Sequence, residues 1–350
     1  MDISGKTMWQ QAAGDTDRNY SDLCLDWDVI LNGPGLKGEW PAVDPKCTPR
    51  KVTDLRRFAK GMQDGDLVVL RMGTSRVLGV GQIVGPYEWC DEFGDVDGWD
   101  LQHVRRVRWL WDYRRSESQF AKSAYSLKLG DTTQRLKSGP VTEWLATLPV
   151  SEQALCRPLR ELPSLSDDNK IDVNEISEFL FDNGVASTSI TTLLNEIGEL
   201  TRIAKWYQRS SMPSEHETVA YLIVPLLRAL GWTPQRMAVE WNHVDLALFE
   251  KLPREDGSLQ VVVEAKKMDN SCLTAESQAT RYTATRPGCG RLIVTDGLRY
   301  GVFIRSEGKF KLYAYLNLTR LRRDYPIYDC SGAGEALLAM APEWTPNVEV

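Results

Sequence analysis

The sequence of 350 residues lacks several features that would place it in a class directly. Its seven cysteines form no CxxC pair and its histidines number three, which argues against a structural zinc site and leaves catalysis to carboxylates and lysine. No apolar run approaches the length of a membrane span, and the first residues lack the basic and apolar regions of a signal peptide. A G-x-x-x-x-G-K-[ST] run is also missing, so this chain encodes no ATP site of that type. We therefore expect a cytoplasmic protein without a membrane partner.

An excess of positive charge is missing as well, because the net charge is -6 and the sequence pI is near 5.4. A nucleic-acid partner would then be bound through local basic patches. One such patch lies in HVRRVRWLW, where Arg105, Arg106 and Arg108 are predicted to contact the DNA backbone. A solvated strand face explains these arginines equally well.

The chain is long enough for two or three domains, and three regions differ in pattern. Residues 1–113 carry short apolar runs between Gly, Pro and Asp, which predicts a small β-barrel with few helices. Residues 114–211 begin polar and continue with helical spacing, so we expect a linker and a helical connector. Residues 212–350 read as helix, three strands, helix and further strands, an α/β sandwich in which helices flank a mixed sheet.

The connector contains one long apolar stripe at helical spacing. We expect this stripe to pack on a neighbouring domain, and a helical dimer seam is the alternative. The stripe consists of Leu193, Leu194, Ile197, Leu200, Ile203 and Ala204.

Two neighbouring apolar strands in the third region carry the charges that point to chemistry. VDLALF contains Asp245, and LQVVVEAKK contains Glu264 and Lys266. Because side chains alternate along a strand, Glu264 and Lys266 share one face. Magnesium takes oxygen ligands and needs one or two carboxylates besides water and phosphate. Two acids and a lysine at one sheet edge therefore predict metal-dependent cleavage of a phosphodiester.

The order of these residues resembles the PD-(D/E)xK nuclease superfamily, whose members have the restriction-endonuclease-like fold. The resemblance covers residues 212–304 and includes an acid on the preceding helix and a Gln-x-x-x-Tyr pattern on the following one. Val244 stands where the superfamily's Pro-Asp dipeptide would place proline. The matching residues are Glu215 or Glu217, then Asp245, Glu264, Lys266, Gln278 and Tyr282.

The resemblance implies a role for each matched residue. Asp245, Glu264 and the Ala265 carbonyl would hold Mg²⁺, for which Mn²⁺ may substitute. Lys266 would orient the attacking water or offset negative charge on the phosphate. Gln278 and Tyr282 lie one helical turn apart and would hold the substrate backbone or the lysine.

The acid of the preceding helix is either Glu215 or Glu217. We prefer Glu215, because it shares a face with Val219, Leu222 and Leu226, which look directed to the core.

The runs MWQQAAGD, VILNGPGLKGEW and GDLVVLRMGTSRVLGVGQIVGPYEW resemble the EVE group of the PUA-like superfamily, over residues 8–111. That resemblance implies a small β-barrel that reads modified bases. A flipped base needs aromatic walls, which Trp27, Trp40, Tyr87 and Trp99 would supply, although tryptophans in a small barrel more often fill its core.

The two resemblances together imply a modification-dependent, type IV-like restriction endonuclease that acts in phage defence. It would bind DNA with modified bases and act as a homodimer, because one nuclease site cuts one strand. The alternatives are a nuclease effector activated by a nucleotide or RNA, and a non-catalytic DNA-binding adaptor for a partner ATPase.

Overall fold

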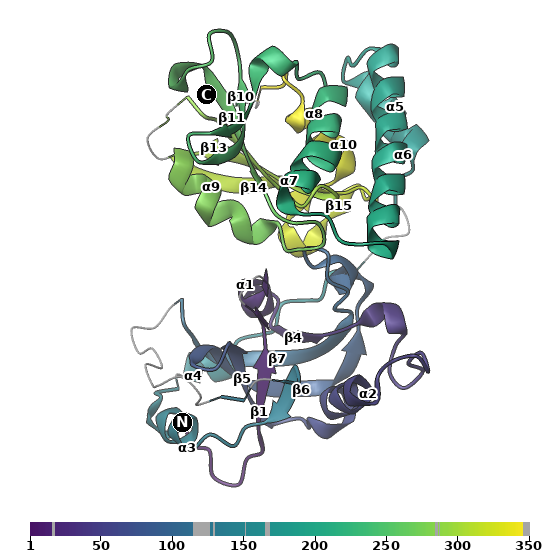
Figure 1. Cartoon of the computed structure of the whole chain (residues 1–350). Coiled ribbons are helices and arrows are strands. Elements are labelled where there is room, and N and C mark those ends of the chain that lie inside the picture. Colours follow the sequence, from purple (N-terminus) through teal and green to yellow (C-terminus); the bar gives the residue numbers. More distant parts are fainter. Residues whose placement is uncertain are drawn as a thin grey trace. The chain divides into compact units, whose positions relative to one another are not determined.

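The computed structural model describes residues 1–15, 18–114, 127–128, 130–150, 152–164, 169–283, 286 and 288–345 (Figure 1). The chain divides into two compact units, Met1–Ser164 and Leu165–Val350. The segment expected as a connector is shared between them, since its first helices belong to the first unit and its later ones to the second. No helix in the described residues is long and apolar enough to cross a membrane.

The first unit is built on a six-stranded sheet that curls into a half-barrel (Figure 1). Its edge strands are short and, within the described residues, they do not pair with each other, so the sheet stays open. Strands β1 and β5 pair in parallel, and all other neighbouring strands of this sheet are antiparallel. In spatial order the strands are β4 (Val29–Asn32), β7 (His103–Asp112), β6 (Arg76–Trp89), β5 (Leu67–Met72), β1 (Met8–Ala12) and β8 (Thr133–Arg135).

Short helices cover this sheet, and a small ribbon stands beside it. The helix α2 begins after Thr48, whose side chain accepts from the Lys51 N–H, and Pro49 occupies its first turn. The elements are the ribbon β2 (Gly14–Asp15) with β3 (Arg18–Asn19), the helices α1 (Ser21–Asp26), α2 (Pro49–Arg56), α3 (Gly139–Thr147) and α4 (Glu152–Cys156), and the short turns η1 (Gly35–Lys37), η2 (Arg57–Gly61) and η3 (Asp91–Asp95).

The second unit contains an eight-stranded mixed sheet with helices on both faces, as the strand pattern predicts. The pairs β11–β12 and β14–β16 are parallel and the others antiparallel. In spatial order the strands are β15 (Asp324–Tyr325), β16 (Cys330–Ser331), β14 (Lys309–Asn317), β13 (Arg299–Ser306), β12 (Arg291–Thr295), β11 (Leu259–Ala265), β10 (Val244–Phe249) and β9 (Met237–Trp241).

Alternation along β11 divides the core into two layers. Val261 and Val263 pack on one side with α5, α6, α8 and α10, and Val262 packs on the other side with α9. The α6 stripe lies in the first layer, where it packs on α8, α5 and η5, as expected for a helix packed on a neighbouring part of the fold. The helices are α5 (Val173–Asp182), α6 (Ser187–Arg209), α7 (Glu215–Thr218), α8 (Val224–Ala229), α9 (Glu276–Thr283) and α10 (Ala333–Met340). The π-helical segment η5 (Val219–Ile223) continues α7 into α8, and the short 3-10 helices are η6 (Pro234–Arg236), η7 (Asp256–Ser258), η8 (Leu273–Ala275) and η9 (Pro326–Tyr328).

Candidate functional site

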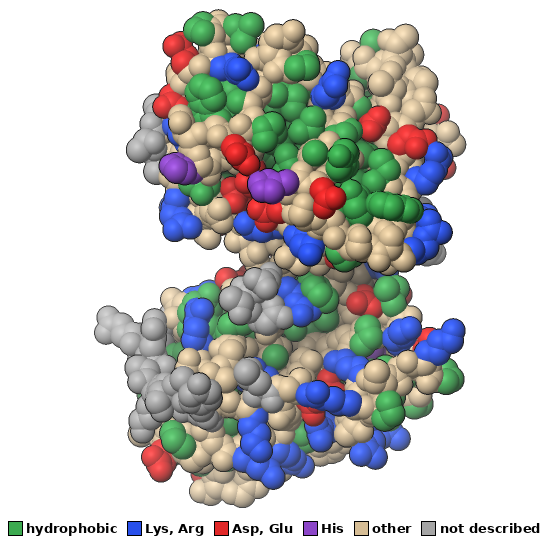
Figure 2. All heavy atoms as spheres, in the orientation of Figure 1, with side chains coloured by type: hydrophobic (Ala, Val, Ile, Leu, Met, Phe, Trp, Pro, Cys, Tyr) green, Lys and Arg blue, Asp and Glu red, His purple; other side chains and the backbone are tan. Residues whose placement is uncertain are grey.

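Asp245 and Glu264 come together at one end of the β10–β11 pair. Leu246 pairs with Val263, so the next residues along, Asp245 and Glu264, follow the last paired position of the two strands. The Asp245 carboxylate is fixed by the Ala265 N–H, which donates to its Oδ2 over 2.7 Å. Acidic side chains gather on the visible face of the second unit in the region of α7 (Figure 2).

Glu264 is a buried carboxylate that is satisfied on one oxygen alone. Its side chain is 2% exposed, and its Oε1 lies 3.3 Å from the Lys266 Nζ. Its Oε2 is buried and has no hydrogen-bond partner in the described part of the chain. Burial raises the pKa of Glu264 to about 7; the Asp245 carboxylate adds to this shift and the Lys266 ammonium opposes it. Since an unsatisfied buried carboxylate oxygen is costly, this atom is suited to a cation.

Lys266 connects the strand to the helix α9. Its Nζ donates to the Oε1 of Glu264 and to the Oε1 of Gln278, both over 3.3 Å. The Gln278 amide then donates to the Tyr282 hydroxyl over 3.3 Å. Glu264 is two residues from Val262, which packs towards α9, and this register brings the strand residues to the Gln-x-x-x-Tyr face.

The two acids of α7 differ in what they contact. Glu217 closes a capping box with Ser214, because its carboxylate accepts from the Ser214 N–H while its own N–H donates to the Ser214 hydroxyl. Glu215 is exposed and has no such role, and its charge contributes to the raised pKa of Glu264. The face shared with Leu222 and Leu226 therefore does not bury Glu215, which lies at the solvent end of the helix.

The donor set fits magnesium. Within the described residues no group of three histidine, cysteine, aspartate or glutamate side chains gathers to hold a metal. Magnesium keeps several waters and binds through one or two carboxylates, so the pair Asp245 and Glu264 meets its minimum demand. The unpartnered Oε2 of Glu264 is the observation in favour of such an ion.

A second group of residues holds the loop that follows Lys266, and the sequence pattern did not reveal it. The buried Asp296 carboxylate accepts from the Asp269 N–H over 3.1 Å and from the Arg299 guanidinium over 2.6 Å. The hydroxyl of Thr218 in α7 accepts from the Met268 N–H. The sequence did contain one signal for this group, because Asp296 is an acid that directly follows the buried strand β12.

The first unit contains a pocket of about 420 Å³ at the end of β4, beside β1 and β5. Trp99 forms an aromatic wall, and the guanidinium of Arg18 lies 3.5 Å from its ring centroid. Asn32, Lys51 and Arg71 also line the pocket.

The other aromatic residues expected at a base pocket lie elsewhere. Trp27 is 5% exposed, stands edge-on to Phe93 and carries the Arg160 guanidinium on its ring. Tyr87 shares a 2.9 Å hydrogen bond with the Nδ1 of His103, and Trp40 is half-buried in the loop between η1 and α2. Of the four predicted aromatics, Trp99 is the one that lines the pocket.

The three arginines of β7 do not form one exposed patch. Arg105 is 2% exposed, and its guanidinium donates to the carbonyls of Ala59 and Gly85. Arg106 donates to the Arg160 carbonyl, and Arg108 is half-buried. Because Arg105 and Arg106 are adjacent in a strand, their side chains point to opposite faces. Burial keeps Arg105 away from any DNA phosphate.

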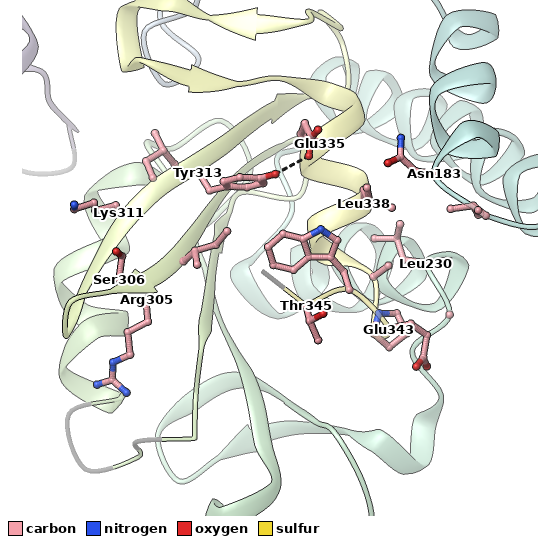
Figure 3. A pocket seen from close by; sticks show the side chains of 18 of the residues that line it. Asn183, Leu230, Arg305, Ser306, Lys311, Tyr313, Glu335, Leu338, Glu343 and Thr345 are labelled. Atoms are coloured by element: carbon pink, nitrogen blue, oxygen red, sulfur yellow. Dashed lines mark hydrogen bonds between the residues drawn. The ribbon is translucent and has the colours of Figure 1, made fainter. Parts of the chain in front are cut away.

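A larger hollow of about 1250 Å³ lies in the second unit between the β13–β14 hairpin, α10 and the residues that follow α10 (Figure 3). On its wall the Tyr313 hydroxyl donates to the Glu335 carboxylate over 2.6 Å, beside the Trp344 indole. None of the predicted site residues lines it.

Comparison with known families covers the first unit alone. A family model described as a domain of unknown function (DUF8426) matches residues 24–132. No curated protein shows a significant match to the chain. The match spans less than half of the chain and leaves the residues around Asp245 and Glu264 outside it.

Proposed function

We propose that this protein is a magnesium-dependent DNA endonuclease of the PD-(D/E)xK type. The observation that carries the proposal is one continuous set of contacts, from Asp245 through the Ala265 N–H to Glu264, Lys266, Gln278 and Tyr282. These residues belong to two strands and a helix that are separated in sequence. Structural ion pairs of a strand end would not explain an unpartnered buried carboxylate oxygen.

Each residue then has a task. Asp245 and Glu264 would hold the ion, which supplies positive charge at the phosphate and an attacking water of lowered pKa. Lys266 keeps its ammonium beside Glu264, where it can donate to a phosphate oxygen as negative charge develops. Gln278 holds the Lys266 ammonium in place, and the Tyr282 hydroxyl holds the Gln278 amide. Glu215 stays exposed at the start of α7, where it can contact the ion through water.

The first unit would recognise a modified base in DNA. This part of the proposal is supported by the pocket at Trp99, whose indole forms an aromatic wall and whose lining includes cationic side chains (Arg18, Lys51 and Arg71) beside the carboxylates of Asp100 and Asp131. A reader joined to a nuclease would restrict modified DNA, as a type IV-like phage-defence enzyme does. Two copies would be needed to cut both strands, so we expect a homodimer on DNA.

Cleavage of modified and unmodified DNA by the purified chain tests the proposal. With magnesium, we expect the wild type to cut modified DNA, and both Asp245→Ala and Lys266→Ala to lose activity. The matched control is Lys267→Ala, because Lys267 is exposed and should be dispensable. Equal cleavage by all four proteins would refute the assignment. Binding without cleavage would instead favour the adaptor, and cleavage only after a nucleotide is added would favour the ligand-activated effector.

A further inference from the structure

The last part of α6 carries cationic and aromatic side chains that the core does not use. The helix runs beside α5 along one margin of the second unit (Figure 1). Its buried residues, which end with Ala204 and Tyr207, form the stripe that faces the core. Residues three, four and seven positions apart share one side of a helix. The exposed residues at this spacing on the outer side of α6 define what we call its basic face: Arg202, Lys205, Trp206 and Arg209.

Two of the three cations on this face have no carboxylate partner. Arg202 forms an ion pair with Glu199 one turn earlier on the same helix. Within the part of the chain that the structure describes, Lys205 and Arg209 form no ion pair, and the Arg209 Nε donates to the Lys205 carbonyl over 3.1 Å. Since the whole chain has a net charge of -6, this local excess of positive charge runs against its composition.

Trp206 lies among these cations with much of its indole in solvent. Its side chain is 55% exposed, and its ring stands edge-on to the buried Tyr207 ring at 4.9 Å between centroids. Cations in the last turn of a helix stabilise the helix dipole, which accounts for Lys205 and Arg209 but not for an exposed tryptophan. Tryptophan and arginine are both enriched where a protein surface binds a partner.

The end of α6 lies beside the candidate site. The Gln208 amide donates over 3.3 Å to the carboxylate of Asp269, in the loop that follows Lys266. Glu215, the first residue of α7, is the sixth residue after Arg209, so a chain of this length keeps the two within about 20 Å of each other. Six base pairs of DNA extend about 20 Å, so a duplex held at the candidate site is long enough to reach the basic face.

We propose that the basic face of α6 binds the sugar–phosphate backbone of the DNA that the candidate site holds. The inference rests on the proposed nuclease function and names the surface that positions its substrate. Lys205 and Arg209 pair with phosphates, and the Trp206 indole packs on the neighbouring sugar. A backbone with a negative charge at every phosphate complements two cations that have no other ionic partner. Such contacts read no sequence, so the face binds modified and unmodified DNA alike.

Binding of short DNA duplexes to the full chain in EDTA, measured over a range of salt concentrations, tests this inference. One duplex carries a central 5-hydroxymethylcytosine and the other is unmodified. We expect the double variant Lys205→Gln/Arg209→Gln to bind both duplexes about tenfold more weakly than the wild type. The slope of log affinity against log salt should become shallower by about 2, since each phosphate contact contributes about 0.9. Trp206→Ala should weaken binding about fivefold with an unchanged salt slope, because it removes no charge.

Lys251→Gln/Lys309→Gln is the matched control, because it removes the same charge from two exposed lysines at the end of the sheet away from Glu264. Its affinity and salt slope should equal those of the wild type. An unchanged affinity or salt slope in Lys205→Gln/Arg209→Gln would overturn the inference, and cleavage by the wild type would still support the proposed function. A wild type that binds neither duplex would overturn both. If Trp206→Ala keeps full DNA affinity but splits a dimer in sedimentation, the face joins two copies of the chain, which also overturns the inference.

Discussion

Removing the charge of Glu264 should stabilise the folded chain, although the same change should stop cleavage. An ordinary glutamate has a pKa near 4.5, and burial raises the pKa of Glu264 to about 7. Since the folded state holds the proton more tightly, the ionised carboxylate lowers stability above pH 7, and this effect vanishes below pH 4.5. A difference of about 2.5 pKa units corresponds to about 3 kcal/mol.

Glu264→Gln keeps the shape of the side chain and removes this cost. In metal-free urea denaturation we expect the variant to be about 3 kcal/mol more stable than the wild type at pH 8, and nearly equal to it at pH 4.5. Magnesium should stabilise the wild type and leave the variant unchanged, because a ligand stabilises only the state that binds it. A variant that is less stable than the wild type at pH 8 would refute the inference that the ionised Glu264 carboxylate destabilises the metal-free protein.

Three further predictions follow from named contacts. Burial lowers the pKa of His103 to about 4. As the pH falls from 6.5 to 4, the free energy of unfolding of the wild type should therefore fall by up to about 3 kcal/mol relative to that of His103→Gln. Parallel stability curves for the two proteins would contradict this. Gln278→Ala should reduce the cleavage rate about ten- to hundredfold with unchanged metal affinity in calorimetry, since Lys266 loses its second partner. Asp296→Ala should cost about 3 kcal/mol in urea denaturation, because it leaves the Arg299 guanidinium and the Asp269 N–H without their buried acceptor, and an unchanged midpoint would exclude that role.

The elements of the second unit could be predicted from the sequence because their patterns are strong. The run Val261–Ala265 packs on both faces, and helical spacing identified the α6 stripe, which belongs to the core layer on one of these faces. The contacts among Glu264, Lys266 and Gln278 follow from the two-residue strand period and the four-residue helix period. The helix α10 was missed, since its short apolar run carries no helical alternation that separates it from a strand.

The residues of the first-unit pocket were harder to predict. Four aromatics were expected there, yet Trp27 at the end of α1 is buried against Phe93, and Trp99 is the one of the four that lines the pocket. Arg71 sits in the apolar strand run LVVLRM, and nothing local shows that its guanidinium stays inside. The sequence did indicate that Arg105 and Arg106 could not both lie in one exposed patch, because neighbouring strand residues face opposite sides and one of the two had to point inward.

We propose above all that Asp245 and Glu264 bind one divalent ion between them. Anomalous diffraction from a crystal soaked in Mn²⁺ measures this directly. We expect one strong peak within bonding distance of both carboxylates, and loss of that peak in Asp245→Ala. Density elsewhere in the second unit, or carboxylates that stay apart in the presence of saturating metal, would contradict the account.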